Sequence, residues 1–383
     1  MQPSRLFLAV AAGVAVATVY FAQPLLVTMG TDLGIAPGTV GVFVTVTQLG
    51  YAAGLFFLVP LGDLLDRRRL IRRQFLLLAT ALLLTGIAQN AAMLLAGLAA
   101  VGALAVVTQS LVAYGASLSA PAERGRTVGM ITSGIVLGIL LARTVSGVVT
   151  DLLGWRAVYL MAGAACLVIA GCLTGSHERP SSRLTYGELL RSTINLWSEP
   201  SFRESAIRAF FIFGSFSTLW SAIALPLTSR SLSHTEIGAF GLIGAAGALA
   251  AGPAGRLADR GHGQLVTLIA SVLLATSWIA TAHLLVGLAI GAVLLDLAVQ
   301  AIHVTNQSLI YRPELGSRLI GGYMVFYSLG SGLGAIASTA LYERAGWSAV
   351  CLLGATFGVG SLVTSIRGAR RSARASRPCE SCP

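Results

Sequence analysis

Long apolar runs, each close to the length that crosses a lipid bilayer, recur along this chain of 383 residues. A helix of about 20 apolar residues spans the hydrocarbon core of a membrane. Lipid offers the backbone no hydrogen bonds, so only helices or closed barrels can cross it, and these runs are too continuously apolar for barrel strands. The sequence therefore predicts an all-α membrane protein. Twelve runs can be placed, near residues 6–29, 39–61, 74–90, 92–117, 127–150, 157–174, 207–228, 235–253, 264–284, 286–310, 319–342 and 348–366.

The composition supports the same class. Charged residues make up 11% of the chain and hydrophobic residues 55%, with a mean hydropathy of +0.79. A soluble domain carries about 25% charged residues, so this chain has too little charge to cover a water-facing surface. The net charge of +11 comes from arginines between the apolar runs, without interleaved aromatic residues. This pattern favours membrane topology over nucleic-acid binding.

The first apolar run, 6–29, is long and is followed by many others, so we interpret it as a retained membrane helix and not as a signal peptide. Cys166, Cys172 and Cys351 lie in apolar runs and are expected to pack as small residues. Cys379 and Cys382 form a lone CxxC in the tail, which is weak support for a metal site. We expect no metal and no cofactor.

The placement of the arginines predicts the orientation in the membrane. One side carries Arg67, Arg68, Arg69, Arg72, Arg73, Arg124, Arg126, Arg179, Arg183, Arg191, Arg203, Arg208, Arg256, Arg260, Arg312, Arg318 and the arginines from Arg367 onward. The opposite side carries only Arg156, Arg230 and Arg344. Positively charged loops stay in the cytoplasm. We therefore expect a multi-pass protein of the cell membrane with both termini in the cytoplasm.

The chain repeats itself at an offset of 192 or 193 residues. Asp66-Arg67 returns as Asp259-Arg260, and Gly154-Trp155 returns as Gly346-Trp347. A duplicated six-helix unit follows, with a substrate path between two pseudo-symmetric bundles. The expected division is an N-terminal bundle at 1–174, an inter-bundle loop in the cytoplasm at 175–206, a C-terminal bundle at 207–366 and a disordered tail at 367–383.

These features resemble the major facilitator superfamily, in particular its bacterial drug and metabolite efflux proteins that act as proton antiporters. The loop signature of that superfamily matches Gly62, Asp66, Arg67 and Arg73, and its second copy matches Gly255, Asp259 and Arg260. The glycine signature of the fifth helix in the efflux branch is matched in part by Gly129, Gly138 and Gly147, with Arg143 where a proline is expected. The resemblance implies twelve transmembrane helices, alternating access and export in exchange for protons.

The two Asp-Arg loops are candidates for gating. A carboxylate beside a guanidinium makes a charge-assisted hydrogen bond, and Asp66 could also approach the N-terminus of a neighbouring helix. Such bonds can hold one side of a transporter closed. Topology alone would also place arginines here, but the repeated Gly-Asp-Arg favours gating.

Charged residues inside membrane helices are costly and usually functional. Asp296, Gln300, His303 and Gln307 share one helix face, flanked by Asn306. This stripe should face other helices or a central cavity. Asp296 or His303 could couple transport to protons, and a structural polar network is the alternative.

Arg143 is the other charge within a helix. It either snorkels to the interface, or recognises an anion or pairs with Asp296. Polar and aromatic residues of other helices are candidates for the same lining: Tyr20, Gln23, Gln48, Tyr51, Gln109 and Trp220.

No nucleophile–base pair or phosphate-binding loop with lysine appears, so we expect no enzyme and no nucleotide-driven pump. The sequence favours a monomeric secondary transporter in membrane lipid with a small-molecule substrate, and the resemblance implies protons as the coupling ion. The resemblance favours efflux of a drug-like or metabolite substrate. A solute importer or facilitator is the alternative, and a non-transporting membrane sensor is an alternative of a different class.

Overall fold

The computed structural model describes residues 3–120, 123–173, 185–282, 286–310 and 316–375, which are almost entirely helical and contain no strand. The expected all-α class is confirmed. Each of the twelve apolar runs falls at least in part on described helix, and eight helical segments of the described residues are long and apolar enough to cross a membrane. The number of crossings itself stays a prediction.

The helices of the first half are α1 (Arg5–Ala17), η1 (Gln23–Leu25), α2 (Leu26–Asp32), η2 (Pro37–Thr39), α3 (Val42–Phe57), α4 (Leu61–Leu64), α5 (Arg67–Gly86), α6 (Ala91–Ala105), α7 (Val107–Ser117), α8 (Arg124–Leu153) and α9 (Trp155–Cys172). The remaining helices are α10 (Tyr186–Asn195), η3 (Leu196–Ser198), α11 (Pro200–Ala222), α12 (Ala224–Thr228), α13 (His234–Ile243), α14 (Ala245–Leu257), η4 (Ala258–His262), α15 (Gly263–Thr281), α16 (Val286–Ile310) and α17 (Gly316–Ala375).

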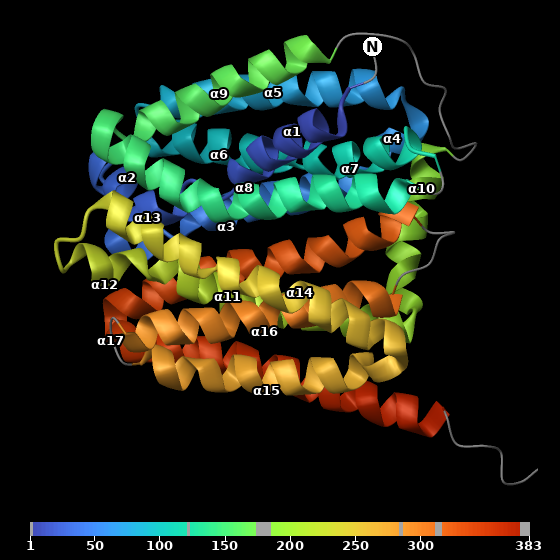
Figure 1. Ribbon diagram of the computed structural model, residues 1–383. Coiled ribbons are helices and arrows are strands. Elements are labelled where there is room, and N and C mark those ends of the chain that lie inside the picture. Colours follow the sequence, from blue (N-terminus) through green and yellow to red (C-terminus); the bar gives the residue numbers. More distant parts are fainter. Residues whose placement is uncertain (1–2, 121–122, 174–184, 283–285, 311–315, 376–383) are drawn as a thin grey trace, which may run out of the picture.

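Helices from the two halves of the chain form two separate bundles (Figure 1). In the first, α1 packs on α8, α3 on α6 and α5 on α9. In the second, α11 packs on α17, and α16 packs on both α14 and α15. Helix α10 stands at one end between the bundles, within the expected loop 175–206. Helix α17 continues to Ala375, past the expected start of the tail at 367, whereas Cys379 and Cys382 lie outside the described residues.

The Gly-Trp repeat marks the same turn in both halves. Gly154 has φ +81° between α8 and α9, and Gly346 has φ +69° within α17, a backbone region that favours glycine. In each half, the indole N–H of the tryptophan that follows donates a hydrogen bond. Trp155 Nε1 donates to Asp32 Oδ2 at 3.1 Å, and Trp347 Nε1 donates to the carbonyl oxygen of Thr281 at 2.7 Å. The repeat in the sequence is therefore a repeat in local structure.

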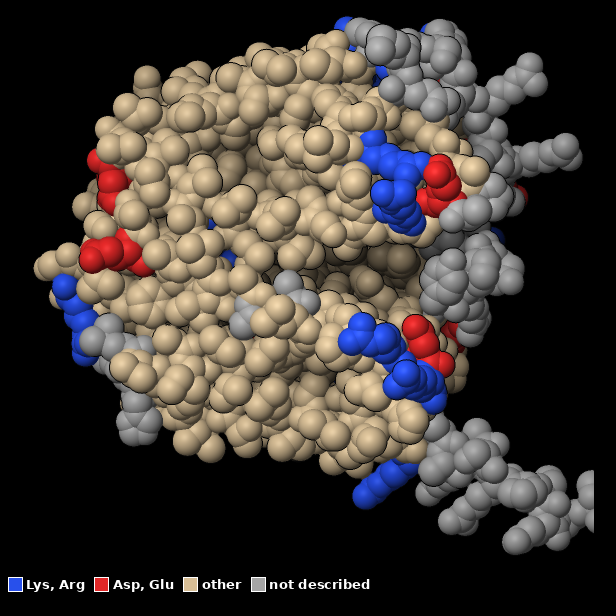
Figure 2. All heavy atoms as spheres, viewed as in Figure 1, with Lys and Arg blue, Asp and Glu red and all other residues tan. Residues whose placement is uncertain are grey.

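Charged side chains gather at the two ends of the molecule, and more of the basic ones lie at one of them (Figure 2). We call the end that carries α4, α10 and η4 the arginine-rich end. The other end, near α12 and α13, is called the opposite end (Figure 1). The long face seen in Figure 2 is mostly uncharged, as expected of helices that contact lipid.

The bundles touch each other toward the opposite end. Thr45 Oγ1 donates to the carbonyl oxygen of Gly332 at 2.7 Å, and Thr144 Oγ1 donates to that of Gly238 at 3.1 Å. Toward the arginine-rich end, α8 has open space at Gly129, where an added Cβ would have no atom within 4 Å. Figure 2 shows a hollow between the bundles on this side. The bundles are thus joined at the opposite end and leave a hollow toward the arginine-rich end, where Gln109 of the first bundle still contacts Met324 of the second.

Close contact of α1 with α8 generates the first prediction. A Cβ at Gly134 would collide with the backbone of Ala9, whereas Gly129 on the same helix lies open. Overpacking costs about 1–3 kcal/mol. We expect Gly134→Leu to lower the thermal unfolding temperature in detergent, followed by intrinsic fluorescence. Gly129→Leu is the matched control, and equal effects of the two substitutions would contradict this packing.

Candidate functional site

Arg143 of α8 lies buried where the two bundles meet, with 3% of its surface exposed. Its Nε donates to Gln23 Oε1 at 2.6 Å. The guanidinium carbon lies 4.3 Å from the centre of the Trp220 ring, 5.3 Å from that of Tyr20 and 5.6 Å from that of Phe216. These distances allow cation–π attraction. The side chain therefore points into the protein, so the snorkelling interpretation is wrong.

Asp296 of α16 is also buried, with 4% exposure, and shares a neighbour with Arg143. Its Oδ1 accepts a hydrogen bond of 3.2 Å from Trp220 Nε1. The indole of Trp220 thus bridges the two charges, since Arg143 lies over its face and Asp296 accepts from its edge. The described contacts contain no direct ion pair between Arg143 and Asp296. Arg143 and Asp296 therefore contact the same ring, and their opposite charges attract each other.

Two glycines of α13 and Gly244, which caps the C-terminus of α13, make room for these charges. A Cβ at Gly238 would lie 2.5 Å from the backbone oxygen of Arg143, and one at Gly241 would lie 2.8 Å from the Arg143 Cβ. A Cβ at Gly244 would lie 2.7 Å from Asp296 Oδ2. Residues spaced by three share a helix face, so α13 presents backbone instead of side chains to both Arg143 and Asp296.

The polar stripe of α16 continues from Asp296 toward the arginine-rich end. Gln300, His303 and Gln307 are half-buried, whereas Asp296 is buried. His303 Nδ1 lies 3.1 Å from the Tyr323 hydroxyl, and Gln307 Nε2 lies 3.2 Å from His303 Nε2. Within the stripe, His303 and Gln307 therefore share a hydrogen bond on one helix face.

Asn306, which flanks the stripe on α16, faces α11 of the same bundle. Arg208 Nε donates to Asn306 Oδ1 at 3.0 Å. Arg208 lies inside α11 with 1% exposure, although the sequence analysis grouped it with the loop arginines. The reason is that α11 begins at Pro200, so Arg208 falls two turns inside the helix. Asn306 thus belongs to a polar network within the second bundle.

The remaining candidate residues lie at different positions between the opposite end and the arginine-rich end. The hydroxyls of Tyr20 and Tyr327 lie 2.5 Å apart and link the two bundles. Gln48 and Tyr51 are buried on α3, and the Oε1 of Gln48 has no hydrogen-bond partner. Gln109 Nε2 donates to Met324 Sδ at 3.4 Å, nearer the arginine-rich end. The structure therefore gathers Tyr20, Gln23, Arg143, Trp220 and Asp296 most closely.

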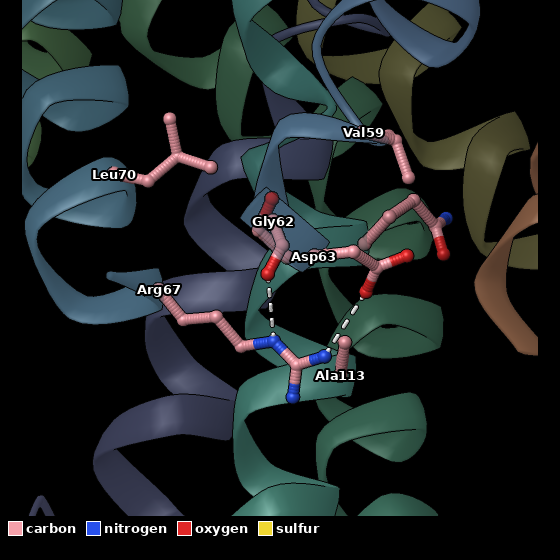
Figure 3. A pocket seen from close by; sticks show the side chains of 8 residues that line it. Val59, Gly62, Asp63, Arg67, Leu70 and Ala113 are labelled. Atoms are coloured by element: carbon pink, nitrogen blue, oxygen red, sulfur yellow. Dashed lines mark hydrogen bonds and ion pairs between the residues drawn. The ribbon is translucent and has the colours of Figure 1, made fainter. Parts of the chain in front are cut away.

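The first Asp-Arg loop encloses a small pocket at the arginine-rich end (Figure 3). Arg67 Nε donates to the carbonyl oxygen of Gly62 at 3.0 Å, and its Nη2 donates to Asp63 Oδ1 at 3.1 Å. Asp66 accepts from the backbone N–H of Arg69 at 3.0 Å and caps α5. Asp63, which the sequence analysis did not single out, is therefore a carboxylate partner of Arg67. The pocket is lined by Val59, Gly62, Asp63, Arg67, Leu70, Gln109, Ser110 and Ala113.

The other loop positions lie at the surface. Arg73 is exposed on α5, and Asp259 and Arg260 are exposed in η4. A Cβ added at Gly255 would lie 3.6 Å from the side chain of Val304 on α16. No ion pair within the described residues joins Asp259 to Arg260. The two copies of the signature thus differ in their contacts.

A second polar cluster, which we call the Asp151 latch, joins the bundles at the opposite end. It comprises Thr28, Asp151, His234 and Thr235. Asp151 Oδ2 accepts from Thr235 N at 2.8 Å and from Thr235 Oγ1 at 2.6 Å, and its Oδ1 accepts from His234 N at 3.2 Å. The His234 ring lies 2.6 Å from both Asp151 Oδ1 and Thr28 Oγ1.

Asp151 of the first bundle thus binds the N-terminus of α13 in the second. Such an N-terminus favours a negative charge. The sequence analysis missed this latch. The available signal was the capping box of Ser233 and Glu236, which marks the helix start at which Asp151 binds.

Comparisons with known proteins agree with this architecture. A family model described as "Major Facilitator Superfamily" matches residues 8–225 and 205–378. The chain is 42% identical over 382 residues to the "Putative uncharacterized transporter YgaY" of Escherichia coli (strain K12), covering 97% of each. It is 33% identical over 390 residues to the "Probable transporter SCO4007" of Streptomyces coelicolor, covering 96% of this chain and 89% of the relative.

Among solved structures, the fold is similar to that of a bacterial homolog of the human lysosomal transporter Spinster, in its inward-facing and unoccupied conformation. The TM-score is 0.72 at 15% identity, covering 98% of each chain.

The Asp151 latch generates the second prediction. Loss of a charged acceptor costs about 1.5–3 kcal/mol per hydrogen bond, so Asp151→Ala should shift the equilibrium toward separation of the bundles at the opposite end. Spin labels at the exposed positions Leu153 and Arg230, one on each bundle, report this separation by pulsed electron resonance. We expect a longer-distance population to appear. Asp32→Ala is the control, because Asp32 bonds only within the first bundle, to Trp155 and Arg156. An unchanged distance distribution in Asp151→Ala would refute the latch.

Proposed function

Since this chain belongs to the major facilitator superfamily and is a multi-pass membrane transporter, we propose that it exports a small solute in exchange for protons. The observation that carries the proposal is the buried set of Arg143, Trp220 and Asp296 at the meeting of the two bundles. Binding sites of such transporters lie near mid-membrane between the repeats. A buried charge at this depth is costly and needs a functional reason.

Alternating access requires one end to open while the other closes. The Asp151 latch and the Thr45–Gly332 hydrogen bond close the opposite end here, and the hollow lies toward the arginine-rich end. Positive-inside topology makes the arginine-rich end cytoplasmic. On this proposal the structure is inward-open, the protein is a monomer in the cell membrane, and both termini lie in the cytoplasm.

Proton coupling is proposed to run through Asp296. It is a carboxylate buried beside the half-buried stripe of Gln300, His303 and Gln307, which offers hydrogen-bonding groups from the arginine-rich end inward. His303 is the less suited group, because its neighbours Tyr323, Gln307 and Phe213 are uncharged and do not stabilise an imidazolium. Antiport then requires that solute and proton bind at Asp296 in alternation.

The Asp-Arg loop is proposed to gate the arginine-rich end. Arg67 is held by the Gly62 carbonyl and by Asp63, and Asp66 fixes the start of α5. This arrangement gives a rigid, charged corner between α4 and α5. Closure of the bundles would bring the corner against the second bundle, where its charges can make new contacts.

The third prediction tests antiport. In proteoliposomes, an imposed pH gradient should drive uptake of a transported solute several-fold above the rate without a gradient, and Asp296→Asn should remove the gradient dependence. Radiolabelled solutes of a broad panel provide the measurement. Asp32→Asn, which alters a carboxylate outside the central site, should keep the dependence. A solute that moves at the same rate with and without the gradient would show a facilitator instead, and gradient-driven movement with the proton would show an importer.

The fourth prediction tests the gate. Asp66→Asn weakens the cap of α5, and Asp63→Asn weakens the hold on Arg67. Both substitutions should reduce the transport rate about tenfold while leaving solute affinity within about twofold, because the loop lies away from the central site. Charge-assisted hydrogen bonds of this kind contribute about 1.5–3 kcal/mol. Rates and binding are compared by transport and by calorimetry. Equal loss of both quantities, or of neither, would argue against gating by this loop.

A further inference from the structure

Arg143 lies over the face of the Trp220 indole and Asp296 accepts from its edge, and each charged group has one atom without a hydrogen-bond partner among the described residues. We propose that the transported solute is a zwitterion with an apolar body, whose carboxylate binds Arg143 and whose protonated amine binds Asp296. This inference rests on the proposed transport function and names the substrate class of the same site.

The carboxylate half of the site is Arg143. Its Nη2 is buried and has no hydrogen-bond partner among the described residues, while its Nε is already held by Gln23. The side chain is fixed from two directions, because the Trp220 ring lies on it and Gly241 of α13 packs against its aliphatic part. A planar guanidinium with one free N–H edge is suited to a carboxylate. A buried donor left without an acceptor is costly, so a ligand oxygen at this position completes the site.

The amine half of the site is Asp296. Trp220 Nε1 occupies Oδ1, and no described donor bonds to Oδ2. The nearest feature of α13 to Oδ2 is Gly244, which contributes no side chain and so leaves the carboxylate uncovered on that side. Carboxylates accept from ammonium groups strongly in a site of low polarity. A protonated amine therefore complements Asp296 as the carboxylate complements Arg143.

The balance of charge excludes singly charged solutes as the best ligands. The titratable or charged groups around the set are Arg143 of α8, His303 of α16, and the tyrosines Tyr20 and Tyr327; α11 contributes Trp220 and α13 contributes glycines. With His303 neutral, Arg143 and Asp296 cancel. An anion or a cation alone would leave a net charge in a buried site, which is costly. A zwitterion keeps the site neutral.

The apolar part of the solute is matched by aromatic rings. Tyr20, Phe216 and Trp220 surround the guanidinium, and the Phe213 ring lies 3.8 Å from the ring of Tyr327, measured between centres. These residues come from both bundles. A solute body that packs among the rings would therefore engage both bundles at once, as a transported ligand must.

The same arrangement accounts for the direction of coupling. A proton and an ammonium group cannot occupy Asp296 together, so a zwitterion competes with protons, which is the condition for antiport. A solute that carries only a carboxylate would neutralise Arg143 and thereby favour protonation of Asp296. Proton and solute would then bind together, which is the condition for symport. Antiport through Asp296 thus calls for an amine on the solute.

The test compares matched ligands on two bodies. The first set is phenylalanine, 3-phenylpropanoate and 2-phenylethylamine, and the second is tryptophan, indole-3-propanoate and tryptamine. Calorimetry on the purified full-length protein at neutral pH should show that at least one zwitterion binds about tenfold or more tightly than both of its singly charged partners. A zwitterion that binds no more tightly than its partners overturns the proposal, as does failure of all six compounds to bind.

Variants assign the two ends of the ligand. Arg143→Gln should weaken the zwitterion about tenfold and leave the amine bound at least as tightly as by the wild type, whereas Asp296→Asn should weaken both and leave the carboxylate compound bound at least as tightly as by the wild type. Arg156→Gln and Asp32→Asn are the matched controls, because these residues pair with each other outside the central site. Arg143→Lys, together with gel filtration of every variant, separates loss of binding from loss of folding. If Arg143→Gln weakens the amine as much as the zwitterion, the assignment is overturned.

Antiport and the substrate class are refuted by different results. Zwitterion affinity should fall as pH is lowered in the wild-type protein and stay constant in Asp296→Asn. A zwitterion that binds with the expected preference but moves through proteoliposomes without dependence on a pH gradient would refute antiport and retain the substrate class. Gradient-driven export of a singly charged compound, with no zwitterion bound, would retain transport and refute the substrate class.

Discussion

A guanidinium buried among lipid-facing helices must be satisfied by the protein, and Arg143 sets this requirement for the centre of the molecule. Water is not available at that depth to solvate the charge. Gln23, the Trp220 ring and Asp296 supply the compensation from three other helical segments. The two bundles are therefore joined at mid-height by electrostatics as well as by packing. Any motion between them must keep the charge of Arg143 compensated.

Helix α13 can approach that centre because it presents glycines there. Gly238, Gly241 and Gly244 bring its backbone against Arg143 and Asp296. The same helix begins at the Asp151 latch. One short element thus touches both the central charges and the closure of the opposite end. A ligand that changes the position of Arg143 or Asp296 acts directly on the helix whose N-terminus is latched, which offers a physical link between binding and gating.

The two ends of the molecule close by different chemistry. At the opposite end, Asp151 caps a helix of the other bundle, with His234 and Thr28 completing the cluster. At the arginine-rich end, the Asp63–Arg67 contact stays within the first bundle, and a hollow lies between the bundles. The sequence repeat gives two similar loops, both at the arginine-rich end, but their contacts differ because such contacts depend on which helices face each other.

The sequence by itself determined the class, the two-fold repeat and the helix positions, because bilayer thickness and backbone hydrogen bonding leave an apolar run of about 20 residues few alternatives. It also singled out Asp296 and Arg143, since charges in such runs are rare. Only the tertiary structure decided that Arg143 turns inward, that Asn306 binds Arg208, and that Asp63 and Asp151 are the acidic partners at the two ends. These contacts join residues far apart in the chain, and helical periodicity gives the face of one helix without naming the helix that packs against it.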